Sequence, residues 1–204
     1  FKNSKVLAID LSLSSLAYAK RKTSELGFNN IEYVQADILE LDKIKQKFDI
    51  IESSGVLHHM ESPMAGWKKL TSLLKTGGLM KLGLYSELAR QNIIKIREKI
   101  SKAEIELSKE GVKTFRSYLI NSNHELLKKL ADTPDFYSIS ELRDLLFHVQ
   151  EHRFTIPQIK QCLDELGLYF CGFESNEAIS DFERSNRKTD DLYDLDKWQA
   201  YEEA

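Results

Sequence analysis

The chain of 204 residues lacks the features that define several large protein classes. Its two cysteines, Cys162 and Cys171, are too few for a disulfide framework, and both lie in apolar-rich stretches typical of buried, reduced thiols. No apolar run approaches the roughly 20 residues that a membrane-spanning helix needs. The first residues lead directly into a strand-like segment instead of a secretory signal. We therefore expect a cytoplasmic protein with no membrane partner.

Positive charge is not in excess either. The chain has 29 Lys and Arg residues against 32 Asp and Glu residues, which gives a net charge of -3 with histidine neutral. Nucleic-acid-binding domains usually carry a basic surplus, so a nucleic-acid partner is disfavoured. Hydrophobic residues make up 42% of the chain and charged residues 30%, as in ordinary globular domains. The length suffices for one domain with a sizeable core, or for one domain plus an appendage.

Two short apolar segments near the start of the chain each end close to an acid. Residues 6–9 lead into Asp10, and residues 31–34 are followed after a short link by Asp37. Residues 11–27 between them have the apolar spacing of a helix and end in glycine. In an open parallel sheet, the carboxyl ends of neighbouring strands share one edge, where ligands bind. Two carboxylates at such an edge suit the hydroxyl and amino groups of a nucleoside.

The alternation of strand and helix continues along the chain. Residues 48–51 and 79–85 read as strands, residues 64–74 between them as a helix, and residues 75–78, which include two glycines, as a turn. Short links between alternating elements favour a parallel α/β sheet. The remaining expectations are helices over 86–109, 114–130, 138–146 and 155–167, a break at Glu110-Gly111, a last strand over 169–173, a loosely structured polar stretch over 175–191 and a final helix over 194–203.

Residues 53–60 read Ser-Ser-Gly-Val-Leu-His-His-Met at the end of a predicted strand, and Lys-Thr-Gly-Gly follows at residues 75–78. With Asp10 and Asp37, this order over residues 6–87 resembles the class I methyltransferases that use S-adenosylmethionine (SAM). The resemblance implies an α/β fold: a Rossmann-like, parallel-sheet methyltransferase core that lacks its first strand and carries a helical insertion before its last strand. It also implies SAM as the cofactor and methyl transfer as the reaction.

The resemblance assigns cofactor contacts to residues at the ends of three strands. In that family, the acid matched by Asp10 accepts hydrogen bonds from the ribose hydroxyls, and the acid matched by Asp37 accepts from the adenine amine. The small residues after the third strand leave room for the methionine portion. The implied cofactor-binding residues are Asp10, Leu11, Asp37, Ile38, Ser53 and Ser54. Both acids have another reading as helix caps, a position where Asp is favoured in its own right, and the two roles can coexist.

The methyl acceptor is expected on the side of the helical insertion. Methyl transfer needs an aligned nucleophile and the exclusion of water, because the sulfonium already activates the methyl group, so we assign no catalytic residue and no metal. The candidate acceptor-site residues are His58, His59, Tyr85, His148, His152 and Arg153. The alternative is that these polar residues cap and bridge insertion helices, and a His-His pair is commonly a surface or capping feature. The acceptor itself cannot be read from the sequence.

The resemblance also suggests how the chain is organised. We expect a partial SAM-binding core over 1–110, a helical insertion covering the substrate over 111–157, the last helix and strand of the core over 158–174, and a polar segment with a C-terminal helix over 175–204. Residues 143–154 resemble bacterial methyltransferase domains that are attached to tetratricopeptide repeats, so the parent chain is expected to carry such a region.

The most specific motif of the family is missing from this sequence. A first strand ending in an acid, followed by a G-x-G loop, should precede Lys5, and in the family that strand lies at the centre of the sheet. We therefore expect the chain to be a truncated piece of a longer methyltransferase. Buried backbone groups left without that strand would be costly, so the resemblance implies activity for the longer parent protein and not for these 204 residues alone.

Two other functions compete with methyl transfer. His148, Glu151 and His152 fit the H-x-x-E-H pattern of inverted zinc proteases, and on a helix the two histidines would share one face, with Glu174 or Glu177 as a third ligand. Short patterns of this kind also arise by chance. The other alternative is a non-catalytic interaction domain built on a degenerate methyltransferase fold, in which the acids would act only as caps.

Overall fold

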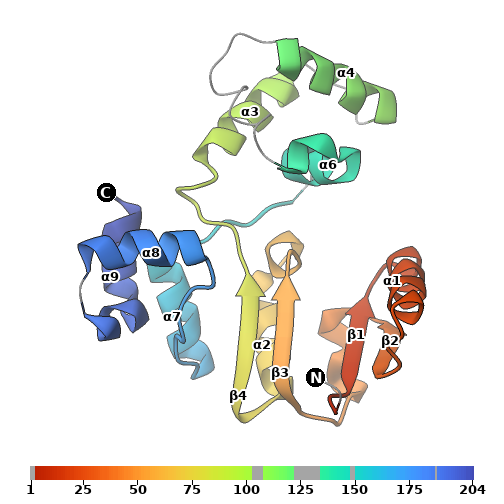
Figure 1. Ribbon diagram of the computed structural model, residues 1–204, viewed down its shortest axis with the longest axis vertical. Coiled ribbons are helices and arrows are strands. Elements are labelled where there is room, and N and C mark those ends of the chain that lie inside the picture. The colour runs from red at the N-terminus through yellow and green to blue at the C-terminus, as the bar shows by residue number, and fades with distance from the viewer. Residues whose placement is uncertain (1–2, 103–107, 122–133, 148–149, 187) are drawn as a thin grey trace. The chain divides into compact units, whose positions relative to one another are not determined.

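The computed structural model describes residues 3–102, 108–121, 134–147, 150–186 and 188–204 (Figure 1). The chain forms two compact units. Unit 1 comprises Phe1–Ser53 and Ser62–Leu82, and unit 2 comprises Ser54–Glu61 and Gly83–Ala204. The expected division of the chain at residues 110, 157 and 174 stays a prediction.

Unit 1 begins with the predicted strand, helix and strand, which are β1 (Val6–Asp10), α1 (Leu13–Glu25) and β2 (Ile31–Gln35). The two strands are parallel, and their register places Asp10 opposite Gln35. Ser12 caps the helix, because its side chain accepts a hydrogen bond from the backbone N–H of Ser15. Gly27 follows the helix with a φ of 79°, a left-handed conformation that glycine adopts without strain. The helix predicted between the two strands and its end at a glycine are confirmed.

The second part of unit 1 is another strand–helix–strand crossover. Its elements are the 3-10 helix η1 (Ile38–Lys43), β3 (Phe48–Ser54), α2 (Pro63–Leu73) and β4 (Leu74–Gly83). Figure 1 shows the arrows of β3 and β4 pointing the same way, with α2 connecting them. Ser62 caps α2, and Pro63 occupies its first turn, where a missing N–H costs nothing. The core of unit 1 contains Leu16, Leu41, Ile51, Trp67, Leu70 and Leu73.

The turn predicted over residues 75–78 is wrong, because these residues belong to β4. The glycines are still required there. Gly77 has a φ of 75°. A Cβ on Gly78 would lie 2.9 Å from the backbone oxygen of Asp49, so no larger side chain fits without a shift. Hydrogen bonding between strands gives two sheets in the described chain, β1-β2 and β3-β4.

After β4, unit 2 contains a helical segment. It is made of α3 (Gln91–Lys102), α4 (Lys109–Asn121), the 3-10 helix η3 (Pro134–Tyr137) and α6 (Ile139–Phe147). Its buried side chains form one cluster: Ile96, Ile100, Val112, Phe115, Leu119, Phe136, Leu142, Leu145 and Leu146. The break predicted at Glu110-Gly111 is wrong, because both residues lie in the first turn of α4. The Ser108 side chain accepts from the Gly111 N–H at 3.1 Å, so the helix begins where a break was expected.

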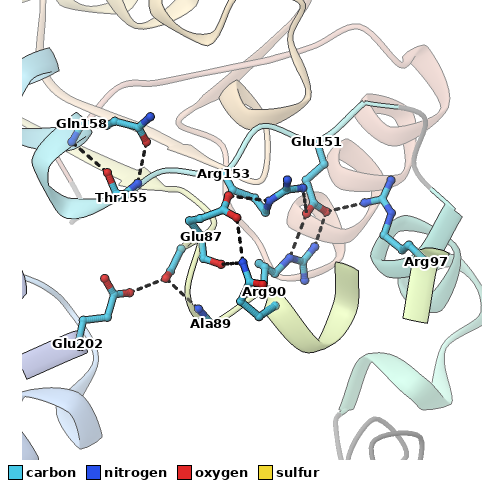
Figure 2. Close-up of polar contacts among 11 residues, drawn as sticks. Glu87, Ala89, Arg90, Arg97, Glu151, Arg153, Thr155, Gln158 and Glu202 are labelled. Atoms are coloured by element: carbon cyan, nitrogen blue, oxygen red, sulfur yellow. Dashed lines mark hydrogen bonds and ion pairs between the residues drawn. The ribbon is translucent and has the colours of Figure 1, made fainter. Parts of the chain in front are cut away.

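The C-terminal part of unit 2 contains α7 (Ile156–Leu166), α8 (Asn176–Ser185), the 3-10 helix η4 (Thr189–Tyr193) and α9 (Leu195–Glu202). The start and end of α7 match the sequence prediction. Thr155 and Gln158 form a capping box, which Figure 2 shows, and Gly167 ends the helix with a φ of 65°. The final helix is confirmed as α9.

Two predictions in this region are wrong. The strand expected over 169–173 does not form; Phe170 and Phe173 instead pack on each other and on the helical core, with the Phe173 ring 4.9 Å from that of Trp198. These two half-buried rings are three residues apart, a spacing that does not follow the two-residue alternation of a strand. The stretch 175–191, expected to be loosely structured, forms α8 and η4, because Phe182 stacks on Trp198 at 4.0 Å and anchors a mainly polar helix.

The two cysteines are less buried than expected. Cys162 is half-buried, and Cys171 is exposed. None of the helices in the described part of the chain combines the length and the hydrophobicity that crossing a membrane requires.

Candidate functional site

The two acids singled out in the sequence lie at one edge of the β1-β2 sheet. Asp10 ends β1, and its Oδ1 accepts from the Ser12 N–H at 2.7 Å. Ala36 donates its N–H to the Asp10 backbone oxygen at 3.3 Å, so the chain leaving β2 passes beside Asp10. Asp37 caps η1, with its Oδ1 accepting from the Leu39 N–H at 2.8 Å. The predicted placement of both acids is confirmed, and so is a capping bond for each.

Capping leaves part of each carboxylate available. Only Oδ1 of Asp10 and Oδ1 of Asp37 are bonded within the described chain, so each acid keeps Oδ2 as an acceptor. Beside them, Leu11 is 67% exposed, and Ile38 is half-buried. The edge therefore presents two acceptor oxygens and apolar surface, a combination that suits a diol, an amine and a ring.

Ser53 and Ser54 at the end of β3 differ in their surroundings. Ser53 is buried, and its hydroxyl oxygen has no hydrogen-bond partner among the described residues. A buried polar group without a partner is rare, and a bound water, ion or ligand is one explanation for it. Ser54 is exposed and belongs to unit 2, where a Cβ on Gly83 would lie 3.1 Å from the Ser54 Cα. The end of β4 thus has room only for glycine beside Ser54.

In unit 2, the segment formed by residues 150–154 binds the His-His segment at residues 57–60, which contains the 3-10 helix η2 (Leu57–His59). The N–H of His152 donates to the His58 backbone oxygen at 2.7 Å. The Nε2 of Gln150 donates to the Met60 backbone oxygen at 3.3 Å, and the Gln150 backbone oxygen accepts from Nδ1 of His59 at 2.9 Å. His152 is therefore a neighbour of His58 and His59, although it lies far from them in the sequence.

The same segment also binds the chain that follows β4. Phe154 donates its N–H to the Tyr85 backbone oxygen at 2.8 Å and accepts from the Glu87 N–H at 3.0 Å. These bonds bring Tyr85 next to the histidines with which the sequence analysis grouped it as a candidate acceptor-site residue. Arg153, also predicted here, donates from Nε to Oε2 of Glu87 at 2.9 Å.

His58 is enclosed by the rings of His59 and Tyr85. It is 1% exposed, and its ring centroid lies 4.3 Å from that of His59 and 4.0 Å from that of Tyr85. Neither ring nitrogen makes a hydrogen bond of good geometry among the described residues. Burial, followed by the neighbouring His59, lowers the His58 pKa from 6.5 to about 4; Arg90 acts in the same direction, and the Gly83 backbone and Glu151 oppose it. The ring is therefore neutral at neutral pH.

Hydrogen bonds indicate where the protons of the other two histidines lie. The Gln150 carbonyl can only accept, so Nδ1 of His59 is the donor. The Nε2 of Gln150 lies 3.1 Å from Nε2 of His152; since this amide nitrogen can only donate, Nε2 of His152 accepts, and neutral His152 carries its proton on Nδ1.

A buried carboxylate is the centre of the polar contacts in unit 2, and Figure 2 shows three guanidinium groups converging on it. The Glu151 side chain is 1% exposed. Arg90 binds it through both oxygens, at 3.3 Å from Nε and 2.6 Å from Nη2. Arg97 lies 3.0 Å away, and Nη1 of Arg153 lies 3.8 Å away. The Arg90 guanidinium also lies 3.6 Å from the centre of the Tyr85 ring, a cation–π contact.

Sequence reasoning missed Arg90, Arg97 and Glu87, and it considered Glu151 only as a zinc-site residue. A signal was present: Arg90 and Arg97 are seven residues apart, and Arg97 follows buried Ile96 on the apolar side of α3. Cations among apolar residues of a helix indicate a buried anion, but the pattern does not say which acid supplies it.

The zinc alternative has a different outcome for each of its residues. His148 lies outside the described residues. The helix on which the pattern depends does not extend through residues 150–153. The Glu151 carboxylate is bound by arginines, and within the described ranges no group of three or more His, Cys, Asp or Glu side chains could hold a metal ion.

Comparison with known proteins connects these features to a family. A family model described as a methyltransferase domain matches residues 1–138. An uncharacterized protein of Synechococcus is 27% identical over 213 residues, an alignment that covers 98% of this chain and 50% of that protein.

Two solved structures have the same fold. PKMT2 from Rickettsia typhi, in complex with AdoHcy, matches with a TM-score of 0.67 and 18% identity, and the match covers 97% of this chain and 41% of PKMT2. Another structure of PKMT2 from Rickettsia typhi gives a TM-score of 0.65 and 21% identity with the same coverage. This likeness confirms the predicted α/β class with a Rossmann-like parallel arrangement. The chain spans half or less of the length of these relatives.

Proposed function

Because the chain belongs to the methyltransferase-domain family, we propose that it forms part of an enzyme that transfers a methyl group from SAM to an acceptor. The observation that carries the cofactor assignment is the pair Asp10 and Asp37 at the carboxyl edge of two parallel strands. The complex of PKMT2 with AdoHcy, the demethylated form of SAM, supports the same cofactor. The methyl acceptor is not identified.

The residues present suit this cofactor. Oδ2 of Asp10 would accept from the ribose hydroxyls and Oδ2 of Asp37 from the adenine amine, with Leu11 and Ile38 supplying apolar surface. The unpartnered hydroxyl of Ser53, with Ser54 next to it, would face the methionine portion. When bound, the cofactor supplies a methyl group that its sulfonium activates. The chain's own residues bind and orient the reactants and exclude water.

We propose that the acceptor is held in unit 2 by His58, His59, Tyr85, His152 and Arg153. The support is that hydrogen bonds and ring contacts gather these residues, and that neither ring nitrogen of His58 makes a hydrogen bond of good geometry with the part of the chain that the structure describes. His148 stays a prediction, since it lies outside the described residues. No general base is required of this group, because the activated methyl group lies on the cofactor.

We further propose that the complete enzyme includes segments of the parent chain beyond these residues. In the described chain β1 and β3 each pair with one strand, so each keeps one edge that could accept another. A further strand with a glycine-rich loop would pair there and hold the methionine end of SAM. An attached tetratricopeptide-repeat region rests only on the resemblance of residues 143–154.

The test is calorimetric titration of S-adenosylhomocysteine into this chain and into a version extended within its parent protein. We expect Asp10→Asn to weaken binding about tenfold or more, because a charged acceptor is lost while the bond to Ser12 can remain. Glu32→Gln, an exposed acid on β2, is the matched control and should leave affinity unchanged. Unaltered binding by Asp10→Asn would refute the site. No binding by either wild-type chain would favour the non-catalytic interaction domain.

A further inference from the structure

We propose that Glu151 is a positioning residue for the acceptor side of methyl transfer, because through Arg90 and Tyr85 it fixes the imidazole ring of His58. The link to methyl transfer rests on the proposed function. The link between the four side chains rests on their contacts alone. All four residues belong to unit 2.

The first step is the hold of Glu151 on Arg90. The carboxylate is 1% exposed and binds both Nε and Nη2 of the guanidinium, a two-point contact that sets the plane of that group. Arg97 and Arg153 also contact the carboxylate, so it is itself held from three sides. The orientation of Arg90 is therefore determined by a fixed partner and not by solvent.

The second step is the contact of Arg90 with Tyr85. The guanidinium lies 3.6 Å from the ring centre, and Arg90 is only 8% exposed, so the pair is shielded from water. A planar guanidinium can bind a carboxylate along one edge while a ring covers its face. Lysine cannot do both, because its ammonium is a compact point charge.

The third step is the contact of Tyr85 with His58, whose ring centroids are 4.0 Å apart at an angle of 31°. The backbones of these two residues are held by the neighbours of Glu151: His152 bonds to His58, and Phe154 bonds to Tyr85. Residues 150–154 thus fix the two rings twice, once through the backbone and once through Arg90.

The state of His58 gives this arrangement a role beyond packing. An apolar side chain would fill the same space without the cost of burying two nitrogens that make no hydrogen bond of good geometry among the described residues. A neutral imidazole offers one donor and one acceptor. We infer that these groups are kept for a ligand group that can hydrogen-bond, such as the N–H, O–H or carbonyl of the methyl acceptor, and that Glu151 keeps the ring in place for it.

The experiment follows the His58 ring by NMR of the full chain with ¹³C-labelled histidine, and His58→Asn identifies the signal. The Tyr85 and His59 rings should displace the wild-type signal from that of a free histidine. In Glu151→Gln and in Arg90→Lys, we expect this displacement to collapse and the His58 pKa to rise from about 4 toward 6.5 as water reaches the ring. Glu87→Gln is the matched control and should change neither value, because the Glu87 carboxylate contacts the side chains of Arg153 and Gln91 and does not contact Arg90, Tyr85 or His58.

The direction of the pKa change separates positioning from charge. Loss of the Glu151 charge with the geometry intact would lower the His58 pKa further, because a nearby anion favours the imidazolium. An unchanged ring signal in both variants, or a lower pKa in Glu151→Gln, would overturn the proposal. If Glu151→Gln does not fold, as judged by far-ultraviolet circular dichroism, Arg90→Lys decides the question, since it keeps the charge and removes only the planar group.

Titration with S-adenosylhomocysteine separates this proposal from the proposed function. We expect Glu151→Gln to bind this probe as tightly as the wild type, because the residue acts on the acceptor side. A loss as large as that of Asp10→Asn would refute that assignment. Absence of binding by the wild-type chain and by its extended version would refute the proposed function, while the His58 signal would still decide whether Glu151 positions the ring.

Discussion

At the scale of single residues, the burial of His58 makes the stability of the protein depend on pH. Its pKa is lowered to about 4 in the folded state against 6.5 in the unfolded chain. Between these two pH values the unfolded chain binds more protons than the folded chain. The contribution of neutral His58 to the unfolding free energy is therefore fully present above about pH 6.5 and decreases as the pH falls through this window. The full shift corresponds to a loss of about 3 kcal/mol.

Denaturant unfolding of the wild type and of His58→Gln between pH 7 and pH 4 measures this effect. We expect the difference in unfolding free energy between the two proteins to shrink as the pH falls, because glutamine does not titrate. Parallel pH profiles for the two proteins would show that His58 is not held neutral by the fold.

At the scale of the element, α7 illustrates how much of a helix is determined locally. Thr155 accepts from the Gln158 N–H at 3.3 Å, and the Gln158 side chain accepts from the Thr155 N–H at 2.8 Å. Thr155→Ala removes one bond of this pair, and we expect a loss of about 1 kcal/mol in unfolding free energy. Thr114→Ala in α4 is the control: its hydroxyl bonds only to the Glu110 carbonyl one turn earlier, so its removal should change stability little. Equal losses in urea unfolding would contradict the capping role.

Local signals of this kind explain which elements were predictable. Ser12, Gly27 and Thr155 act within a few residues of their own position, so the sequence shows their roles directly. The edge that carries Asp10 and Asp37 was predictable for a related reason, since strand, helix and parallel strand follow each other with short links.

Contacts between distant segments were not predictable. Glu151 is 61 residues from Arg90 in the chain, and no local pattern names its partner. The strand predicted at 169–173 failed for the same reason, because Phe173 packs on Trp198 from another helix. The His58 environment likewise depends on Tyr85 and His152, which come from separate segments.

At the scale of the whole molecule, each unit contains its own buried tryptophan, Trp67 in unit 1 and Trp198 in unit 2. Because each lies in a separate core, we expect the two to report different unfolding midpoints in urea. Fluorescence of Trp198→Phe follows unit 1, and that of Trp67→Phe follows unit 2. Far-ultraviolet circular dichroism of both variants is the control for damage by the substitution. Coincident midpoints would mean that the chain unfolds as a single cooperative unit.

The bonds that join Tyr85 and Glu87 to Phe154 also have a consequence for how this protein can diversify. They place the point where the chain enters the helical segment beside the point where it returns. When the two ends of a segment lie side by side, the segment can change in length and composition while the flanking chain keeps its path. A relative could thus carry a different helical segment in place of residues 88–149 and keep the proposed acceptor residues, provided that the replacement still presents two guanidinium groups to Glu151.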